Sequence, residues 1–168
     1  MPEGKVVAVC LKAEPGLPKL PVESIELVAG MGVAGDYHFG RTVRHRFLAK
    51  KDPLRLNQRQ VLLLDTSIYA ALAEQGIRLQ PGSMGENILV DGLQVMEMGI
   101  GTILEIGPVR LEVTEQRNPC YQLNGMHPAL LKAVAYKREG RVIRQAGVMA
   151  RILTGGPVRP RDPIKVSN

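Results

Sequence analysis

The sequence contains few aromatic residues and few cysteines, and each scarcity argues against a class of protein. Aromatic residues make up 4% of the 168 residues, and tryptophan is absent. Proteins that bind single-stranded nucleic acid usually stack bases on aromatic rings, so this composition disfavours nucleic acid as the partner. The two cysteines cannot form a disulfide framework, and they are too few to hold an iron–sulfur cluster with four thiolate ligands.

Long hydrophobic runs are also missing. No apolar stretch approaches the roughly 18 residues needed to span a bilayer, and residues 1–12 lack the features of a signal peptide. We therefore expect a cytoplasmic protein that does not insert into a membrane. The hydrophobic fraction of 45% and the charged fraction of 23% are ordinary for a globular protein, and the length predicts a single domain over residues 1–168.

The charge balance is positive, with 22 Lys and Arg against 16 Asp and Glu and a formal net charge of +6. Such an excess favours an acidic partner, for example a phosphate-bearing cofactor or an anionic surface. Much of it lies in the basic segment 41–59, where only Asp52 is acidic and the cations before Arg59 are Arg41, Arg44, Arg46, Lys50, Lys51 and Arg55. This segment is either a solvated loop or a surface that recruits an anionic ligand.

Short strand patterns dominate the chain. We expect single strands at 5–11, 25–29, 60–64, 147–153 and 164–166, and hairpins around Asp91-Gly92 (87–95) and Gly107-Pro108 (102–114). Helices are expected at 65–75 and 128–136, and residues 30–57 form a long irregular excursion. Because no β-α-β alternation is visible, the pattern predicts a mainly β fold: a closed or partly open antiparallel β-barrel with two or three short helices.

The stretch 117–121 contains the best candidate for a reactive group. Asn118 is a good helix N-cap and Pro119 suits the first helical position, which would place Cys120 in the first turn. The positive end of a helix and the nearby Arg117 would both stabilise a thiolate. Cys120 is thus a candidate nucleophile or metal ligand, or alternatively a small buried hydrophobe, the role we expect for Cys10 in the first strand.

Two glycine-bearing turns carry further polar residues. If the chain is extended after Gly35, Asp36 and His38 share a face, but two ligands are too few for a metal site. His38 is then either a structural residue hydrogen-bonded to Asp36 or a ligand contact. In the second turn, 81–87, Glu86 and Asn87 should point to opposite faces of a regular strand, so at most one should face a site unless a bulge intervenes.

Together these segments resemble the MOSC domain, named for its occurrence at the C-terminus of molybdenum cofactor sulfurases. The matching motifs are Gly32-x-x-Gly35-Asp36-x-His38, Arg59 before the Val61 strand, Gly82-x-x-Gly85-Glu86-Asn87-Ile88, Arg117-x-Pro119-Cys120, Gly147-x-x-Ala150-Arg151 and a terminal turn at Gly156. Their order and approximate spacing agree over about 28–166, and the chain is similar to the small stand-alone bacterial members. Arg161-Asp162 stands where the family usually has a Gly-Asp turn.

The resemblance implies a barrel-like fold and a role for each motif residue. Cys120 would carry sulfur as a persulfide or ligate the molybdenum of a pterin cofactor. Cofactor-binding residues implied at the other motif positions are Arg117, Arg59 and Arg151 for its phosphate or pterin, with Gly35, Asp36, His38, Glu86 and Asn87 lining the same cleft. The family is also associated with pyridoxal phosphate binding.

Three functions are compatible with these features. The leading one is a domain that binds molybdenum cofactor, carries sulfur, or does both, using Cys120 and a sulfur donor protein as partner. A second is a molybdenum-dependent reductase of N-hydroxylated compounds, which would need an electron-donor protein because the chain has no flavin or iron–sulfur signature. The third is a non-enzymatic binder of anionic partners through the basic segment 41–59, recognisable by its sensitivity to salt.

Overall fold

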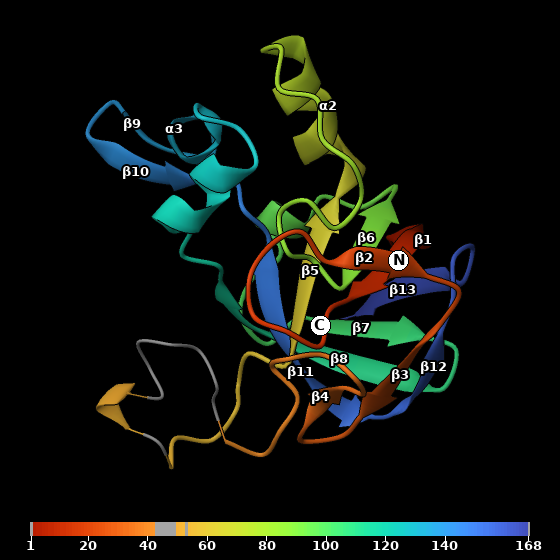
Figure 1. Ribbon diagram of the computed structural model, residues 1–168. Coiled ribbons are helices and arrows are strands. Elements are labelled where there is room, and N and C mark those ends of the chain that lie inside the picture. The colour runs from red at the N-terminus through yellow and green to blue at the C-terminus, as the bar shows by residue number, and fades with distance from the viewer. Residues whose placement is uncertain (1, 43–49, 53, 168) are drawn as a thin grey trace.

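A closed barrel of seven strands forms the centre of the molecule in the described part of the chain. The computed structural model describes residues 2–42, 50–52 and 54–167 (Figure 1). The barrel strands are β1 (Glu3–Leu11), β5 (Val61–Asp65), β6 (Ile88–Asp91), β7 (Ile103–Ile106), β8 (Val109–Gln116), β11 (Val148–Thr154) and β13 (Pro163–Ser167). They pair in the order β13-β7-β8-β11-β5-β6-β1, and β1 pairs back to β13. The expected barrel-like β fold is confirmed.

The remaining strands lie around this barrel. β2 (Leu20–Val22) pairs with the end of β1, while β12 (Gly156–Val158), β3 (Ile25–Val28) and β4 (Gly32–Val33) form a separate sheet. β9 (Ala135–Arg138) and β10 (Arg141–Arg144) form a hairpin of their own that stands away from the barrel (Figure 1).

Period-2 alternation of apolar residues positions the barrel strands. In β7 and β8 the buried residues alternate with more exposed ones, as in Leu104 and Ile106 or Leu111 and Val113. β1 is apolar on both faces over its second half, and Cys10 is fully buried there, which confirms its expected place in the core.

One pair of barrel strands is parallel. β5 and β6 run side by side in the same direction, joined through α2 (Thr66–Glu74), so the expectation that the chain has no β-α-β unit is wrong at this point. A parallel pair requires a long crossover, and the segment between these strands supplies it. The helix itself begins and ends as predicted: the Asp65 carboxylate accepts a hydrogen bond from the Ser67 N–H (2.9 Å), and Gly76 follows the helix with φ +81°.

The hairpin expected around Asp91-Gly92 is also wrong. β6 already has β5 on one side and β1 on the other, so no edge is free for a returning strand. After Gly92 the chain instead enters the short 3-10 helix η1 (Val95–Glu97). The second predicted hairpin is confirmed, because β7 and β8 pair directly across Gly107-Pro108.

A small lobe follows Cys120 before the chain returns to the barrel. It contains the 3-10 helix η2 (Tyr121–Gly125), α3 (Leu130–Val134) and the β9–β10 hairpin, and we call residues 121–144 the 121–144 lobe. α3 is shorter than the predicted helix 128–136 because the chain turns into β9 at Ala135. Both α2 and α3 are short, and no helix in the described part of the chain is long and apolar enough to cross a membrane.

The excursion 30–57 is largely irregular, as expected. Its described part contains β4 and an isolated bridge between Thr42 and Leu56, and the Asn57 amide ties it together by donating to the carbonyls of His38 and Gly40 (both 3.0 Å). The predicted cations Arg44 and Arg46 lie outside the described residues.

Candidate functional site

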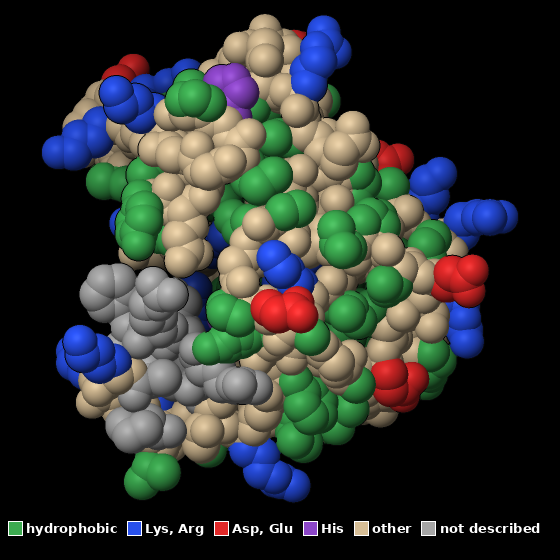
Figure 2. Space-filling model, viewed as in Figure 1, with side chains coloured by type: hydrophobic (Ala, Val, Ile, Leu, Met, Phe, Trp, Pro, Cys, Tyr) green, Lys and Arg blue, Asp and Glu red, His purple; other side chains and the backbone are tan. Residues whose placement is uncertain are grey.

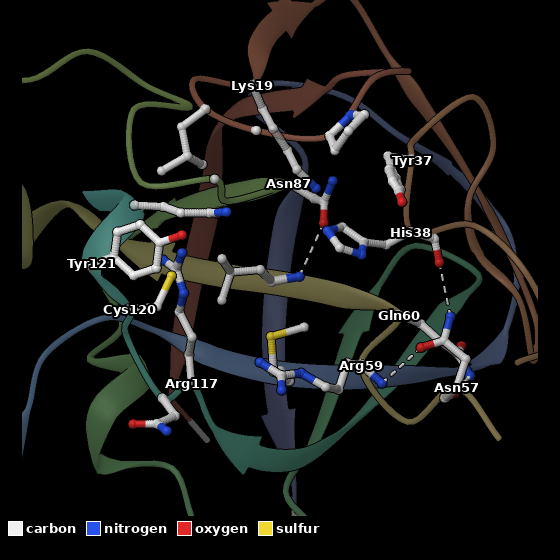
Figure 3. A pocket seen from close by; sticks show the side chains of 18 residues that line it. Lys19, Tyr37, His38, Asn57, Arg59, Gln60, Asn87, Arg117, Cys120 and Tyr121 are labelled. Atoms are coloured by element: carbon white, nitrogen blue, oxygen red, sulfur yellow. Dashed lines mark hydrogen bonds between the residues drawn. The ribbon is translucent and has the colours of Figure 1, made fainter. Parts of the chain in front are cut away.

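A cavity of about 330 Å³ lies where segments far apart in the sequence meet (Figure 3). It is bounded by the loop 15–19, the turn 37–38, the segment 57–62, Gly85 and Asn87, and the segment 117–122 that contains Cys120. Three cationic side chains, Lys19, Arg59 and Arg117, line it, and no carboxylate belongs to its lining among the described residues. The cavity is therefore suited to an anionic ligand.

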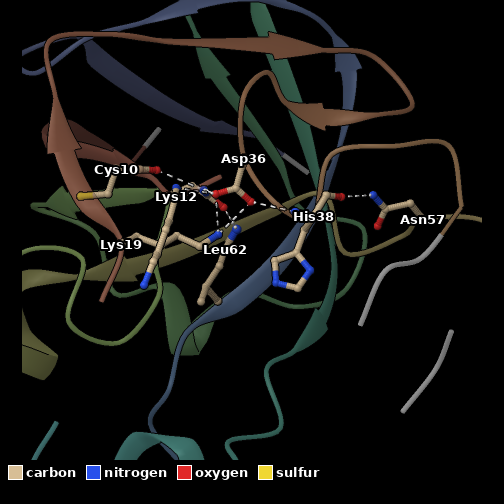
Figure 4. Close-up of polar contacts among 8 residues, drawn as sticks. Cys10, Lys12, Lys19, Asp36, His38, Asn57 and Leu62 are labelled. Atoms are coloured by element: carbon tan, nitrogen blue, oxygen red, sulfur yellow. Dashed lines mark hydrogen bonds and ion pairs between the residues drawn. The ribbon is translucent and has the colours of Figure 1, made fainter. Parts of the chain in front are cut away.

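A buried ion pair forms part of the cavity wall. The Lys19 side chain is 8% exposed, and its Nζ lies 3.0 Å from both carboxylate oxygens of Asp36 (Figure 4). Burial lowers the pKa of Lys19, and the Asp36 carboxylate acts in the opposite direction. Asp36 also accepts hydrogen bonds from the backbone N–H groups of Lys12 and His38 (both 3.1 Å). Asp36 thus lies behind the cavity and holds Lys19, which lines it.

Two glycines of the second glycine-bearing turn let the loop 15–19 reach the cavity. Gly82 has φ +91°, and its carbonyl accepts a hydrogen bond from the Lys19 N–H (2.9 Å). A Cβ at Gly82 would lie 2.0 Å from the Lys19 carbonyl oxygen, and one at Gly85 (φ +89°) would lie 2.9 Å from Leu17 Cδ2. A larger residue at Gly82 would push the Lys19 backbone out of place, whereas one at Gly85 would displace the Leu17 side chain.

Glu86 and Asn87 point in different directions, as expected from their adjacent positions. Asn87 lines the cavity and joins three segments: its Oδ1 accepts from the Leu62 N–H and its Nδ2 donates to the Cys10 carbonyl (both 3.1 Å). Glu86 is fully buried beneath the cavity, where it accepts hydrogen bonds from the Tyr69 hydroxyl (2.7 Å) and the Gly82 N–H (3.0 Å). Burial raises the pKa of Glu86.

Of the three predicted arginines, two lie in the cavity. Arg117 Nη1 donates to the Met84 carbonyl, and the nearby Cys120 and Glu86 favour its charged form, opposing the lowering of its pKa by burial. Arg59 Nε lies 3.2 Å from Glu115 Oε1, and Cys120 favours its charged form as well. Arginine keeps its proton in such settings, so both remain cations.

Arg151, the third predicted arginine, does not line the cavity. Its side chain is 41% exposed, and its Nε lies 2.7 Å from Glu112 Oε1 on the neighbouring strand. Regular alternation would put Arg151 on the same face as Met149, which lines the cavity, but the β11–β8 ladder shifts register between Met149 and Ala150, and Arg151 is paired across it with Glu112.

Cys120 is a free and exposed thiol in the cavity wall, but the predicted helix geometry around it is wrong. Cys120 is itself the N-cap of the five-residue η2, with φ −126° and ψ 172°, and it is not in a first turn capped by Asn118. The charged groups that interact with Cys120 are therefore two arginines, Arg59 and Arg117, and not the end of a capped helix.

The first glycine-bearing turn contributes His38 to the cavity but not Gly35. Residues 36–38 form a turn and not an extended strand, so Asp36 and His38 do not share a strand face. The link between them runs from the His38 backbone N–H, and the imidazole ring stacks on Tyr37 at a centroid distance of 5.2 Å. Gly35 has φ +86° and permits the turn.

Several lining residues were not predicted from the sequence. Lys19 is the most important, and its only sequence signal is a lone lysine between Pro18 and Pro21 in a loop with no periodicity. Asn57 and Gln60 are buried polar residues linked by a hydrogen bond from Gln60 Nε2 to the Asn57 carbonyl (2.7 Å). Gln60 is a polar residue directly before an apolar strand, and this position is a sequence signal that could have identified it.

The two cysteines should differ strongly in reactivity. Cys10 is fully buried, and burial raises the pKa of its thiol to about 12, whereas Cys120 is exposed beside two arginines. Because the thiolate is the reactive form, we expect iodoacetamide at pH 7.5 to modify Cys120 at least about 100-fold faster than Cys10. Peptide mass spectrometry over time measures both rates, and a urea-unfolded control should make them similar. Equal rates in the folded protein would contradict this account.

The fold and the cavity together define a β-barrel protein whose cationic pocket presents one accessible thiol. The family model of the MOSC domain matches residues 34–165, and the chain belongs to the MOSC domain family. This family is generally associated with molybdenum cofactor sulfurase-like function. The comparison with curated proteins finds no match.

Solved structures show the same fold at low sequence identity. The YuaD protein from Bacillus subtilis matches with a TM-score of 0.80 and 18% identity, covering 98% of this chain and 95% of that one. YiiM from Geobacillus stearothermophilus has a TM-score of 0.71 at 20% identity, over 98% and 75% of the two chains. YiiM from Escherichia coli has a TM-score of 0.65 at 20% identity, over 99% and 70%.

Proposed function

We propose that the cavity binds a molybdenum cofactor, with Cys120 as the thiolate contact to the metal or its sulfur. The observation that carries the proposal is the meeting of Lys19, Arg59 and Arg117 with an exposed free cysteine in one cavity. The cations suit the phosphate of such a cofactor, because guanidinium groups bind phosphate through paired donors. A thiolate is a soft ligand that suits molybdenum or transferable sulfur.

The residues present fit a metal that arrives within an organic ligand. The described residues contain no group of three or more His, Cys, Asp or Glu able to hold a metal ion, so a bare ion would find too few ligands. A cofactor that brings its own metal ligands needs only one from the protein. The amides of Asn57, Gln60 and Asn87 add hydrogen-bonding groups of the kind that a pterin ring requires, and the volume lies at the lower end of ligand cavities.

Each lining residue then has a defined task. Arg117, Arg59 and Lys19 bind the anionic part of the ligand, while Asp36 keeps Lys19 in place. Leu17 and Met149 provide the apolar part of the wall. Cys120 offers its sulfur from the exposed side of the cavity. When bound, the cofactor would supply molybdenum-centred electron and oxygen-atom transfer, the chemistry needed to reduce an N-hydroxylated compound with an external electron donor.

Sulfur carriage is the second candidate function, and the exposure of Cys120 favours it. A persulfide on this residue would be accessible to a donor protein. Binding through the basic segment 41–59 alone has less support. Among the described cations of that segment, Arg59 is the one that lines the cavity.

Molybdenum retention tests the proposal. After incubation with freshly released molybdenum cofactor and desalting, we expect the wild type to retain at least about tenfold more molybdenum per chain than Cys120→Ala, since removing a metal ligand commonly costs at least that factor. Cys10→Ala is the matched control, because Cys10 lies in the core and outside the cavity lining.

Two outcomes would contradict the proposal in different ways. Equal retention by wild type and Cys120→Ala would remove Cys120 as the contact while leaving a cofactor site. No retention by either would favour the sulfur carrier, and incubation with a cysteine desulfurase should then add one sulfur atom to Cys120, as detected by intact mass spectrometry.

A further inference from the structure

We propose that the β9–β10 hairpin docks an acidic partner protein whose carboxylates surround an apolar contact. The lobe that carries this hairpin is strongly basic. Residues 121–144 contain five Lys and Arg and a single acid, Glu139. All five cations are exposed: Lys132, Lys137, Arg138, Arg141 and Arg144. Lys and Arg side chains gather over this lobe at the upper left of Figure 2, on the segment that stands apart from the barrel in Figure 1.

Two of these cations lie directly opposite each other in the hairpin, and no acidic side chain among the described residues is paired with either. The register of the hairpin places Arg138 directly opposite Arg141, across the tight turn Glu139-Gly140, in which both residues have positive φ (53° and 78°). Like charges directly opposite each other in an antiparallel pair are destabilising. Within the described residues none of the five cations forms an ion pair. The hairpin thus holds an unbalanced positive charge that an external anion would neutralise.

An apolar centre distinguishes this surface from a simple polyanion site. Val142 is 52% exposed, and it lies opposite Lys137 on the same face of the hairpin as Arg144. Protein interfaces combine an apolar centre with a polar rim, whereas nucleic-acid backbones are bound through charge alone or with stacked aromatic rings. Val142 offers no stacking surface. The face that carries Val142, Lys137 and Arg144 therefore favours a protein with acidic residues around an apolar side chain, and the Arg138–Arg141 pair adds charge on the other face of the hairpin.

The hairpin is joined to the cavity by the chain itself. The lobe begins at Tyr121, directly after Cys120, and both Tyr121 and Gln122 line the cavity. η2 packs on α3, and α3 packs on β9. A protein held on the hairpin would stand beside the cavity that contains Cys120. What such a partner would exchange with the cavity rests on the proposed function, but its docking does not.

The size of the surface sets the strength of the interaction. A single hairpin offers only a small contact area, which is typical of transient encounters. Charge complementarity acts mainly on the association rate and is weakened by salt. We therefore expect weak, rapidly reversible binding that is strongest at low ionic strength.

The test uses a synthetic acidic peptide, with Asp and Glu flanking a central Leu-Phe pair, and a single-stranded RNA of equal charge. Fluorescence anisotropy at low salt gives the dissociation constants, and amide chemical shifts map the site on the full chain. We expect the wild type to bind the peptide through residues 135–144. Lys137→Gln/Arg144→Gln, which removes the cations on the face of Val142, should weaken peptide binding at least about tenfold, and Val142→Ser should weaken it several-fold.

Matched controls separate docking from folding and from net charge. Arg78→Gln/Arg159→Gln removes two exposed cations that lie outside the lobe and the cavity lining, and it should change peptide binding less than twofold. Lys137→Gln/Arg144→Gln removes two exposed cations that form no ion pair among the described residues, so its melting temperature should stay close to that of the wild type. Cys120→Ala, which loses molybdenum under the proposed function, should still bind the peptide, so the two proposals can fail separately.

Three results would overturn the docking proposal. The first is no peptide binding by the wild type at low salt. The second is an equal loss in the Arg78→Gln/Arg159→Gln control, which would indicate attraction by net charge alone. The third is tighter binding of the RNA, lost in Lys137→Gln/Arg144→Gln and unaffected by Val142→Ser, which would identify a nucleic-acid surface.

Discussion

Replacing Asp36 with alanine is expected to lower the free energy of unfolding by about 3–5 kcal/mol, the usual cost of removing one partner from a buried ion pair. The Lys19 ammonium would be left buried without its carboxylate, which lies 3.0 Å away in the wild type. The backbone N–H groups of Lys12 and His38 would also lose their acceptor. Urea denaturation followed by circular dichroism measures the change.

A double-mutant cycle separates the ion pair from the backbone hydrogen bonds. Adding Lys19→Met to Asp36→Ala removes the uncompensated charge and should recover part of the lost stability. Asp36→Asn keeps an acceptor oxygen and should cost less than Asp36→Ala. If Asp36→Ala costs under about 1 kcal/mol, or if Lys19→Met restores nothing, then the pair does not hold the cavity wall as described.

Replacing Arg117 with alanine is expected to weaken cofactor retention at least about 100-fold, because a buried charge-assisted contact would be lost together with the packing around it. Arg117 lines the cavity, donates to the Met84 carbonyl and has Cys120 and Glu86 nearby. Arg117→Lys keeps the charge without the planar fork of donors, so it should retain an intermediate amount of molybdenum. Molybdenum per chain is measured after desalting.

Arg151→Ala is the matched control for this experiment. Arg151 also occupies a motif position, but its side chain pairs with Glu112 outside the cavity lining. We expect Arg151→Ala to change retention less than twofold. A loss as large as that of Arg117→Ala would show that Arg151 contacts the ligand. Circular dichroism melting of each variant distinguishes a lost contact from a lost fold.

Local sequence patterns were sufficient for several elements of the fold. The cap at Asp65 and the stop at Gly76 set the ends of α2, and the turn Gly107-Pro108 set the β7–β8 hairpin. Alternation of apolar residues placed Cys10 in a buried strand. These predictions succeeded because they depend on hydrogen bonds and side-chain faces within a few residues.

Long-range pairing decided the points at which the sequence prediction failed. Asp91-Gly92 is a good turn sequence, but both edges of β6 are occupied by strands that lie far away in the chain. Long-range pairing also makes β5 and β6 parallel neighbours, and no local sequence pattern predicts this. Around Cys120 the tertiary course of the chain leaves only a short η2 where local signals predicted a capped helix.

The sequence by itself determined the barrel-like class of this protein, its family motifs and the thiol at Cys120. Only the tertiary structure decided which charges share the cavity: it brought Lys19 to Asp36 and placed Arg117 and Arg59 beside Cys120, but it turned Arg151 toward Glu112. Local patterns reflect backbone preference and the polarity of each face. The neighbours of a charged side chain depend on which distant strands pair, and closure of the barrel sets that pairing.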